Sequence, residues 1–389
     1  RGAVSVAGHA GKAFWFSKSS GEFVTSTYYY KEYPEWVTAW NARKPAAAYA
    51  GKAWELMHPV EKYLFGKADD REYETDFPGF GRTFPHAYGE EGDKYLTTRL
   101  TLSPAGDELT LDFAKALLDN EQLGQDDVPD YLSVSFSSTD YVGHLFGASS
   151  LESEDNIGRL DRTLAELLAY VDKKVGLKNT LIVLSADHGQ PEIPGHLHDL
   201  GIENAHYFDA QSLDKTPAIA ALKKKLGIGE ELIEAYFQPY IYLNQKLIRA
   251  KGLDQAEVEK VVAEELMKFD GVAAAVSSTA LRTASLPDTL LNRTILRNFH
   301  SKRSGDIYLV FEPNVFINDF DGLTVASTHG SPWRYDTFVP VMFAGAGLQP
   351  QSVSRLITPY DVAPTLSAYL GVKPPSAAIG NPLPEVLGQ

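Results

Sequence analysis

Four short stretches of this 389-residue sequence combine acids and histidines. They are STDYVGH with Asp140 and His144, ADHG with Asp187 and His188, GHLHD with His196, His198 and Asp199, and STHGS with His329. Carboxylate oxygens and imidazole nitrogens bind zinc and several other divalent ions. The chain has no cysteine, which excludes thiolate nucleophiles, disulfides and cysteine-ligated zinc. The chemistry to expect at these stretches is therefore binding of a metal by His, Asp and Glu.

The spacing within two of the stretches favours shared ligation. Asp140 and His144 are four residues apart, so on a helical turn they face the same way and can bind one cation. Asp187 and His188 are adjacent, and the turn that Gly189 permits would let both reach one ion. Each stretch alone also has an ordinary structural explanation, such as a capping acid beside a surface imidazole.

The stretches adjoin predicted core elements. Residues 130–138 (DYLSVSFSS) form a β-rich run, residues 154–176 have apolar side chains at helical spacing, and residues 179–189 (NTLIVLSADHG) contain a short apolar strand. This is the βαβ pattern of a parallel sheet, in which sites collect beyond the carboxyl ends of strands. Residues 337–348 predict a further buried strand just after His329, followed by a helix over residues 357–371. Five nitrogen and oxygen ligands near these strands suit two metal ions better than one.

The composition and residue patterns of the other segments predict insertions in one catalytic domain. Residues 28–100 are dense in aromatic residues and proline, which is typical of an insertion or lid. Residues 210–311 predict a small inserted α+β subdomain, with a strand at FQPYIYLN, a helix at DQAEVEKVVAEELMKF, and strands at GVAAAVSS and GDIYLVFEP. The core is then expected over residues 1–27, 101–209 and 312–389.

Composition limits the class of protein and its partners. A hydrophobic content of 44% is that of a folded chain with a substantial core. A formal net charge of −15 argues against nucleic acid as a partner, because nucleic-acid binding usually needs a basic face. No stretch approaches the about 18 apolar residues that span a bilayer, so no membrane span is expected.

Several of these segments together resemble the alkaline phosphatase superfamily. They are RGAVSVAGHAGKAFWF, VTSTYYYKEYPEWVTAWN, the run from SFSSTDYVGHLFG to NTLIVLSADHG, and STHGSPWRYDTFVPVMFAG. The resemblance is closest to the bacterial PafA-type alkaline phosphatases with a threonine nucleophile, which are relatives of the nucleotide pyrophosphatase/phosphodiesterases. It implies an α/β fold, a three-layer α/β/α sandwich with a mostly parallel central sheet and inserted cap subdomains. It also implies zinc-dependent hydrolysis of phosphate monoesters through a phosphothreonine intermediate.

The resemblance assigns roles to six residues. It implies that Asp140, His144 and His329 bind one Zn²⁺, and that Asp187 and His188 bind a second. Arg1 resembles the arginine of the subgroup's Lys-x-Arg phosphate clamp; a guanidinium there favours a dianionic monoester over a diester. The family's remaining Asp ligand and its nucleophile have no counterpart in this sequence, so we expect a segment upstream of Arg1. His9, His196 and His198 are expected to be structural, surface or lid residues.

Other interpretations remain open. A nucleotide pyrophosphatase or phosphodiesterase could use the same scaffold, and a protein that truly began at Arg1 would be a metal-binding fragment without activity. A metal-free α/β domain is the plainest alternative. The expected partners are small-molecule phosphate esters, the expected oligomeric state is a monomer, and the resemblance implies a periplasmic or secreted location.

Overall fold

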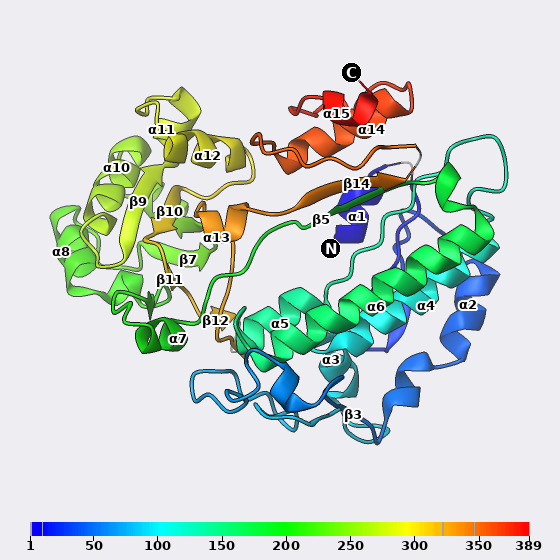
Figure 1. The fold of residues 1–389 in the computed structure, drawn as a ribbon. Helices are drawn as coiled ribbons and strands as arrows, with labels where there is room; N and C mark the ends of the chain where they lie inside the picture. The colour runs from blue at the N-terminus through cyan, green and yellow to red at the C-terminus, as the bar shows by residue number, and fades with distance from the viewer. Residues whose placement is uncertain (1, 10, 321–322, 346, 389) are drawn as a thin grey trace. The chain divides into compact units, whose positions relative to one another are not determined.

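The computed structural model describes residues 2–9, 11–320, 323–345 and 347–388 (Figure 1). The chain divides into two compact units: unit 1 comprises Arg1–Asp187 and Val339–Gln389, and unit 2 comprises His188–Phe338. The core and insertion boundaries that the sequence indicates stay a prediction. None of the helices in the described ranges is long and apolar enough to cross a membrane.

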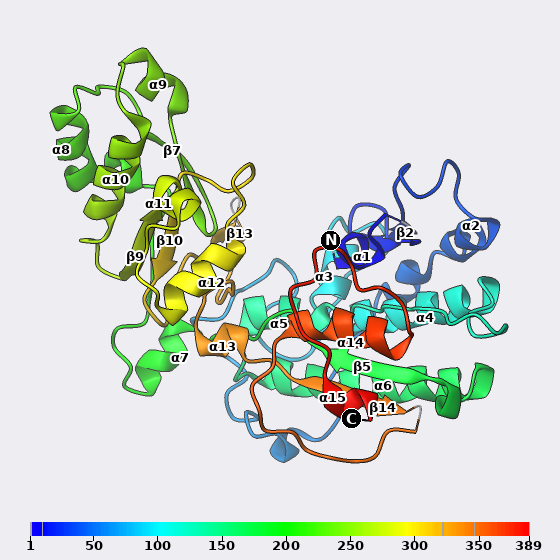
Figure 2. The same ribbon diagram turned by 90° about the horizontal axis from the view of Figure 1, so that it is seen from above.

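Unit 1 is organised around three long helices. Helix α6 (Leu151–Lys174) packs against α4 (Pro104–Asn120) and α5 (Ser138–Phe146), as Figures 1 and 2 show. The Ser150 side chain accepts a hydrogen bond from the Ser153 N–H, which satisfies one of the donors that a helix start leaves unpaired. The helix expected over residues 154–176 is therefore confirmed, with a start three residues earlier.

The prediction of a strand over residues 130–138 is wrong. Side chains from 131 to 137 alternate between exposed and half-buried, as in a strand, but no described segment pairs with them, and α5 begins at Ser138. Strand β5 (Leu181–Ser185) does form, and it pairs with β14 (Val341–Gly345). That pairing is antiparallel, with Val341 opposite Ser185, so the parallel pairing expected around β5 is also absent from the described residues. A strand is defined by its partner's hydrogen bonds, and composition alone does not supply them.

An aromatic core supports the helices of unit 1. The rings of Phe23 and Phe113 stack with 4.0 Å between centroids, and Trp40 meets both edge-on. The same cluster contains Trp54 and, from α5, Val142. The aromatic residues around the expected insertion thus contribute to the base on which α5 rests.

Unit 2 contains a four-stranded antiparallel sheet in the order β7-β8-β10-β9. One face carries α8, α9 and α10, and the other carries α11 and α12 (Figure 2). The strand expected at FQPYIYLN is confirmed as β8, which begins at Tyr240. It forms the second half of a hairpin whose first strand, β7, ends at Phe237. Pro239 lies in the connection, where its missing N–H is not needed for pairing. The bounds are β7 Ile233–Phe237, β8 Tyr240–Leu243, β9 Val272–Ser277, β10 Ile307–Phe311, α8 Pro217–Lys225, α9 Gln245–Ala250, α10 Gln255–Leu266, α11 Ser278–Thr283 and α12 Leu290–Asn298.

Shorter elements complete both units. In unit 1 they are α1 Gly2–Ala7, β1 Trp15–Ser17, β2 Glu22–Val24, α2 Glu35–Ala42, β3 Ala53–Trp54, β4 His86–Ala87, α3 Leu96–Thr101, α14 Val362–Tyr369 and α15 Pro384–Leu387. In unit 2 they are α7 Pro194–Asp199, β6 His206–Tyr207, β11 Val315–Phe316, β12 Asp319–Phe320, β13 Leu323–Thr324 and α13 Arg334–Thr337. The predicted helix over residues 357–371 is present as a 3₁₀ turn, Pro359–Asp361, followed by α14, and Thr358 and Asp361 form a capping box at its start.

Candidate functional site

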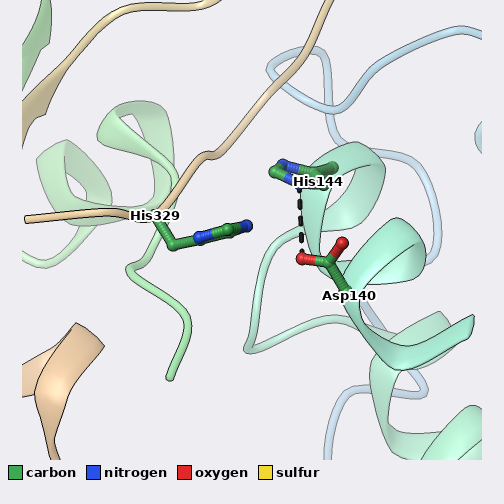
Figure 3. A group of neighbouring side chains, drawn as sticks. All are labelled: Asp140, His144 and His329. Carbon is green, nitrogen blue, oxygen red and sulfur yellow. Dashed lines mark ion pairs between the residues drawn. The ribbon is translucent and has the colours of Figure 1, made fainter. Parts of the chain in front are cut away.

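Helix α5 presents an acid and a histidine on one face. The Asp140 Oδ1 and His144 Nε2 atoms lie 3.3 Å apart, and both side chains are partly exposed (Figure 3). The i, i+4 spacing therefore brings one carboxylate oxygen and one imidazole nitrogen together on the helix, as the sequence predicted. His329, which is also drawn in Figure 3, belongs to unit 2.

Buried polar groups from the neighbouring helices fix the start of α5. The carboxylate of Asp107, on α4, accepts a hydrogen bond from the Ser138 N–H at 3.1 Å, and burial raises the pKa of Asp107 to about 6. The Asn156 Nδ2, on α6, donates to the Thr139 hydroxyl at 2.9 Å, and Asn156 is only 1% exposed. Two helices thus hold the turn that carries Asp140.

Two loops of unit 2 bring His188 and His329 together. Their rings are nearly parallel, with 3.3 Å between centroids. The Gln190 Nε2 donates to the Ser327 hydroxyl at 2.9 Å, and that hydroxyl donates to the Pro191 carbonyl at 2.9 Å. The His329 carbonyl accepts from the Gln238 Nε2 at 2.8 Å. Residues far apart in the sequence therefore form one histidine-bearing surface within unit 2.

Asp336 connects both of these loops. Its carboxylate accepts hydrogen bonds from the Gly330 and Ser331 N–H groups at 3.1 and 2.7 Å, and from the Ser331 hydroxyl at 2.6 Å. Its main-chain carbonyl accepts from the Gly189 N–H at 2.7 Å. Burial raises the pKa of Asp336, while the bonds from Ser331 and the charge of His329 oppose that rise.

Gly189 has a different role from the one expected. Its φ is not positive, so the turn does not need glycine for its backbone conformation. Instead, a Cβ at this position would lie 2.1 Å from the Tyr335 carbonyl oxygen. Glycine is required because the two loops approach each other closely, which corrects the reason given from the sequence.

The remaining residues that the sequence singled out lie outside the two groups described above. Asp187 is exposed just beyond β5, and Arg1 lies outside the described residues. His198 shares a hydrogen bond with the Ala205 carbonyl at 2.7 Å, and His196 is half-buried on the same short helix, α7. His9 shares a hydrogen bond of 2.7 Å with the Tyr28 hydroxyl.

Unit 1 contains a buried acidic group that the sequence did not predict. Glu74 is 4% exposed, and neither of its carboxylate oxygens has a hydrogen-bond partner among the described residues. Burial and the charge of Glu152 raise the pKa of Glu74 to about 9. Burial also raises the pKa of Glu152 to about 8 and lowers the pKa of His86 to about 4. His86 and Glu152 lie 3.2 Å apart, and burial disfavours the charged form of each.

The ligand types fit a divalent transition metal. Asp140 and His144 supply one oxygen and one nitrogen from a helix, and His188 and His329 supply nitrogens from loops tied by hydrogen bonds. Zinc accepts this mixture of carboxylate and imidazole ligands. The sequence singled out these four residues but not Asp336, Asp107 and Asn156, whose hydrogen bonds hold the segments that carry them.

Several known proteins are similar to this chain in sequence. Residues 6–332 match the family model for type I phosphodiesterase / nucleotide pyrophosphatase. Alkaline phosphatase PafA of Elizabethkingia meningoseptica is 34% identical over 397 residues, covering 100% of this chain and 70% of the relative. A protein of Myroides odoratus named calcium-transporting ATPase is 37% identical over 397 residues, covering 100% of this chain and 71% of the relative.

A solved structure extends the likeness to the fold. The crystal structure of wild-type alkaline phosphatase PafA aligns with a TM-score of 0.86 and 33% identity, covering 98% of this chain and 72% of that one. The predicted alkaline-phosphatase-like α/β fold is confirmed by this match. This chain belongs to the type I phosphodiesterase / nucleotide pyrophosphatase family, and it is a phosphoric ester hydrolase with an alkaline-phosphatase-like fold.

Proposed function

We propose that this protein is a zinc-dependent phosphomonoesterase. The observation that carries the proposal is the likeness to an alkaline phosphatase, which extends over 98% of the chain with a TM-score of 0.86. The ligand residues on α5 and on the two loops of unit 2 support it, because they have the chemistry that a zinc centre requires.

We assign the ligands as two sets. Asp140, His144 and His329 would bind one zinc ion, and Asp187 and His188 the second. When bound, a pair of zinc ions supplies Lewis-acid stabilisation of the attacking and leaving oxygens at phosphorus. The protein's own part is to hold these ligands in position, through the buried contacts around α5 and around Asp336.

The other groups of the reaction follow from the family resemblance. Arg1 would donate two parallel hydrogen bonds to the nonbridging phosphoryl oxygens, which favours a dianionic monoester. The attacking group would be a threonine, to which we assign no residue of the sequence, and the intermediate a phosphothreonine. Export to the periplasm or the medium is part of the same proposal.

A phosphodiesterase is the second candidate. The observation that favours it is the family model itself, which describes type I phosphodiesterases and matches residues 6–332. The two functions differ in the charge of the substrate, because a diester has one negative charge fewer and an extra substituent that needs an apolar pocket.

One experiment separates these functions. The purified protein is analysed for bound metals and then assayed with p-nitrophenyl phosphate, bis-p-nitrophenyl phosphate and ATP. We expect about two zinc ions per chain, following the two-metal arrangement, and the highest kcat/KM for the monoester. A preference for the diester would establish the second candidate instead, and an inactive protein that binds no zinc after reconstitution would contradict both.

A further inference from the structure

We infer that Asp336 is a positioning residue that holds His188 and His329 in the arrangement that binds metal. The inference rests on the proposed function, in which both histidines are zinc ligands. It concerns the step before catalysis: how two loops that are separate in the sequence come to present their imidazoles together.

The carboxylate of Asp336 organises the loop that follows His329. One oxygen, Oδ2, accepts hydrogen bonds from the Gly330 N–H, the Ser331 N–H and the Ser331 hydroxyl. Three donors to one carboxylate oxygen fix the backbone conformation immediately after His329. Charge-assisted hydrogen bonds of this kind are shorter and stronger than neutral ones.

The main chain of the same residue organises the loop that follows His188. The Asp336 carbonyl accepts a hydrogen bond of 2.7 Å from the Gly189 N–H. The neighbouring Tyr335 carbonyl lies so close to Gly189 that no side chain fits there. A single turn of helix α13 therefore fixes the residue after each histidine.

The burial of Asp336 shows that this contact is costly to build. The residue is 4% exposed, and its second carboxylate oxygen, Oδ1, has no hydrogen-bond partner among the described residues. A buried acceptor without a partner destabilises the fold. A smaller neutral side chain could also complete this turn. We therefore attribute the presence of a buried carboxylate to its role in positioning His188 and His329.

The test compares Asp336→Asn with a matched control, Asp214→Asn. Asp214 is also a buried acid of unit 2, 7% exposed, and it accepts hydrogen bonds from the Leu232 and Ile233 N–H groups at 2.9 and 2.8 Å. Its hydrogen bonds serve the segment leading into β7 and not the histidine loops. Zinc affinity is measured by competition with a chromophoric chelator, and thermal stability is measured on the same samples.

We expect Asp336→Asn to weaken zinc binding by about tenfold, the lower end for groups that orient a metal ligand, because the uncharged amide oxygen accepts the same hydrogen bonds more weakly. Added zinc should then restore kcat to near the wild-type value, because the ligands themselves are intact. Asp214→Asn should lower the melting temperature without changing zinc affinity. A purely structural role for Asp336 would give the control's pattern, and that result would overturn the inference.

A milder variant keeps the test decisive if Asp336→Asn does not fold. Ser331→Ala removes the hydroxyl donor to Asp336 and also the acceptor of a 3.3 Å hydrogen bond from the Trp333 N–H. We expect a loss in zinc affinity of about 3- to 10-fold, below the range for the full group. Unchanged affinity in this variant would also overturn the inference. The proposed function fails differently, since in that case the wild-type protein itself would bind no zinc.

Discussion

The proposed metal ligands on helix α5 and those on the loops of unit 2 are held in place by different means. On α5, successive backbone hydrogen bonds fix the spacing of Asp140 and His144, and Asp107 and Asn156 hold the start of the helix. In unit 2, His188 and His329 depend on cross-links between loops, chiefly through Asp336 and Ser327. The helix therefore fixes the relative positions of Asp140 and His144 without metal, whereas the arrangement of His188 and His329 depends on a few side chains.

The largest effect should come from removing a ligand on the helix. Asp140→Ala is expected to reduce kcat/KM by on the order of 10³-fold, because the charge stabilisation that a bound metal gives is lost. Helix α5 should keep its structure, since the backbone bonds and the contacts to Ser138 and Thr139 remain. Steady-state kinetics and circular dichroism check the two parts of this expectation. Wild-type kinetics in a folded Asp140→Ala protein would remove Asp140 from the site.

Removing the metal should separate the two regions directly. We expect chelator treatment to abolish activity and to increase amide hydrogen exchange at residues 186–191 and 327–331 by about tenfold or more, with little change in α5. The reason is that loops with few backbone hydrogen bonds open at low free energy, whereas a packed helix does not. Hydrogen exchange followed by mass spectrometry measures both segments in one sample. Equal exchange increases in both segments would show that α5 is no more preorganised than the loops.

The sequence predicted the helices well because their signals are local. The apolar spacing of α6 and of α10 follows the helical period, and Ser150 and Asp254 cap their starts with side-chain hydrogen bonds. The Asp140–His144 pair was predictable for the same reason, because residues four apart on a helix share a face.

Features that depend on long-range pairing could not be predicted. Residues 131–137 have strand composition, yet a strand also needs a partner's hydrogen bonds, and the antiparallel direction of β5 and β14 is not encoded in either segment alone. Asp336 was missed because nothing in the local pattern shows that its carbonyl meets Gly189. The signal that could have pointed to it is the glycine itself, which marks a close approach.

A smaller effect should follow from loosening the support of α5. Asn156→Ala removes the hydrogen bond to the Thr139 hydroxyl, and we expect zinc affinity and kcat/KM to fall by about tenfold, the lower end for groups that orient a ligand. The control is Asn179→Ala, where the lost bond is to the Val175 carbonyl at the exposed end of α6. Chelator competition and kinetics measure both variants. If the two lose affinity equally, the contact to Thr139 does not position Asp140.

The smallest effect on catalysis should come from the buried acids near α6, which alter stability instead. The pKa of Glu74 is raised from 4.5 to about 9, so between these pH values the folded protein holds a proton that the unfolded chain has lost. The stability from this proton is complete below pH 4.5 and is lost as the pH rises through about 9. His86, with its pKa lowered to about 4, has the opposite effect and only in acid. Glu74→Gln keeps the shape without the titration, so at pH 4, below both pKa values of Glu74, the variant should match the wild type in urea unfolding. At pH 6, where the folded wild type still holds the proton, it should match the wild type in kcat. At pH 9 the variant's free energy of unfolding should exceed the wild type's by several kcal/mol, because each pH unit between the two pKa values costs the wild type about 1.4 kcal/mol. Parallel changes of stability from pH 4 to 9 in both proteins would mean that Glu74 is ionised in the folded protein.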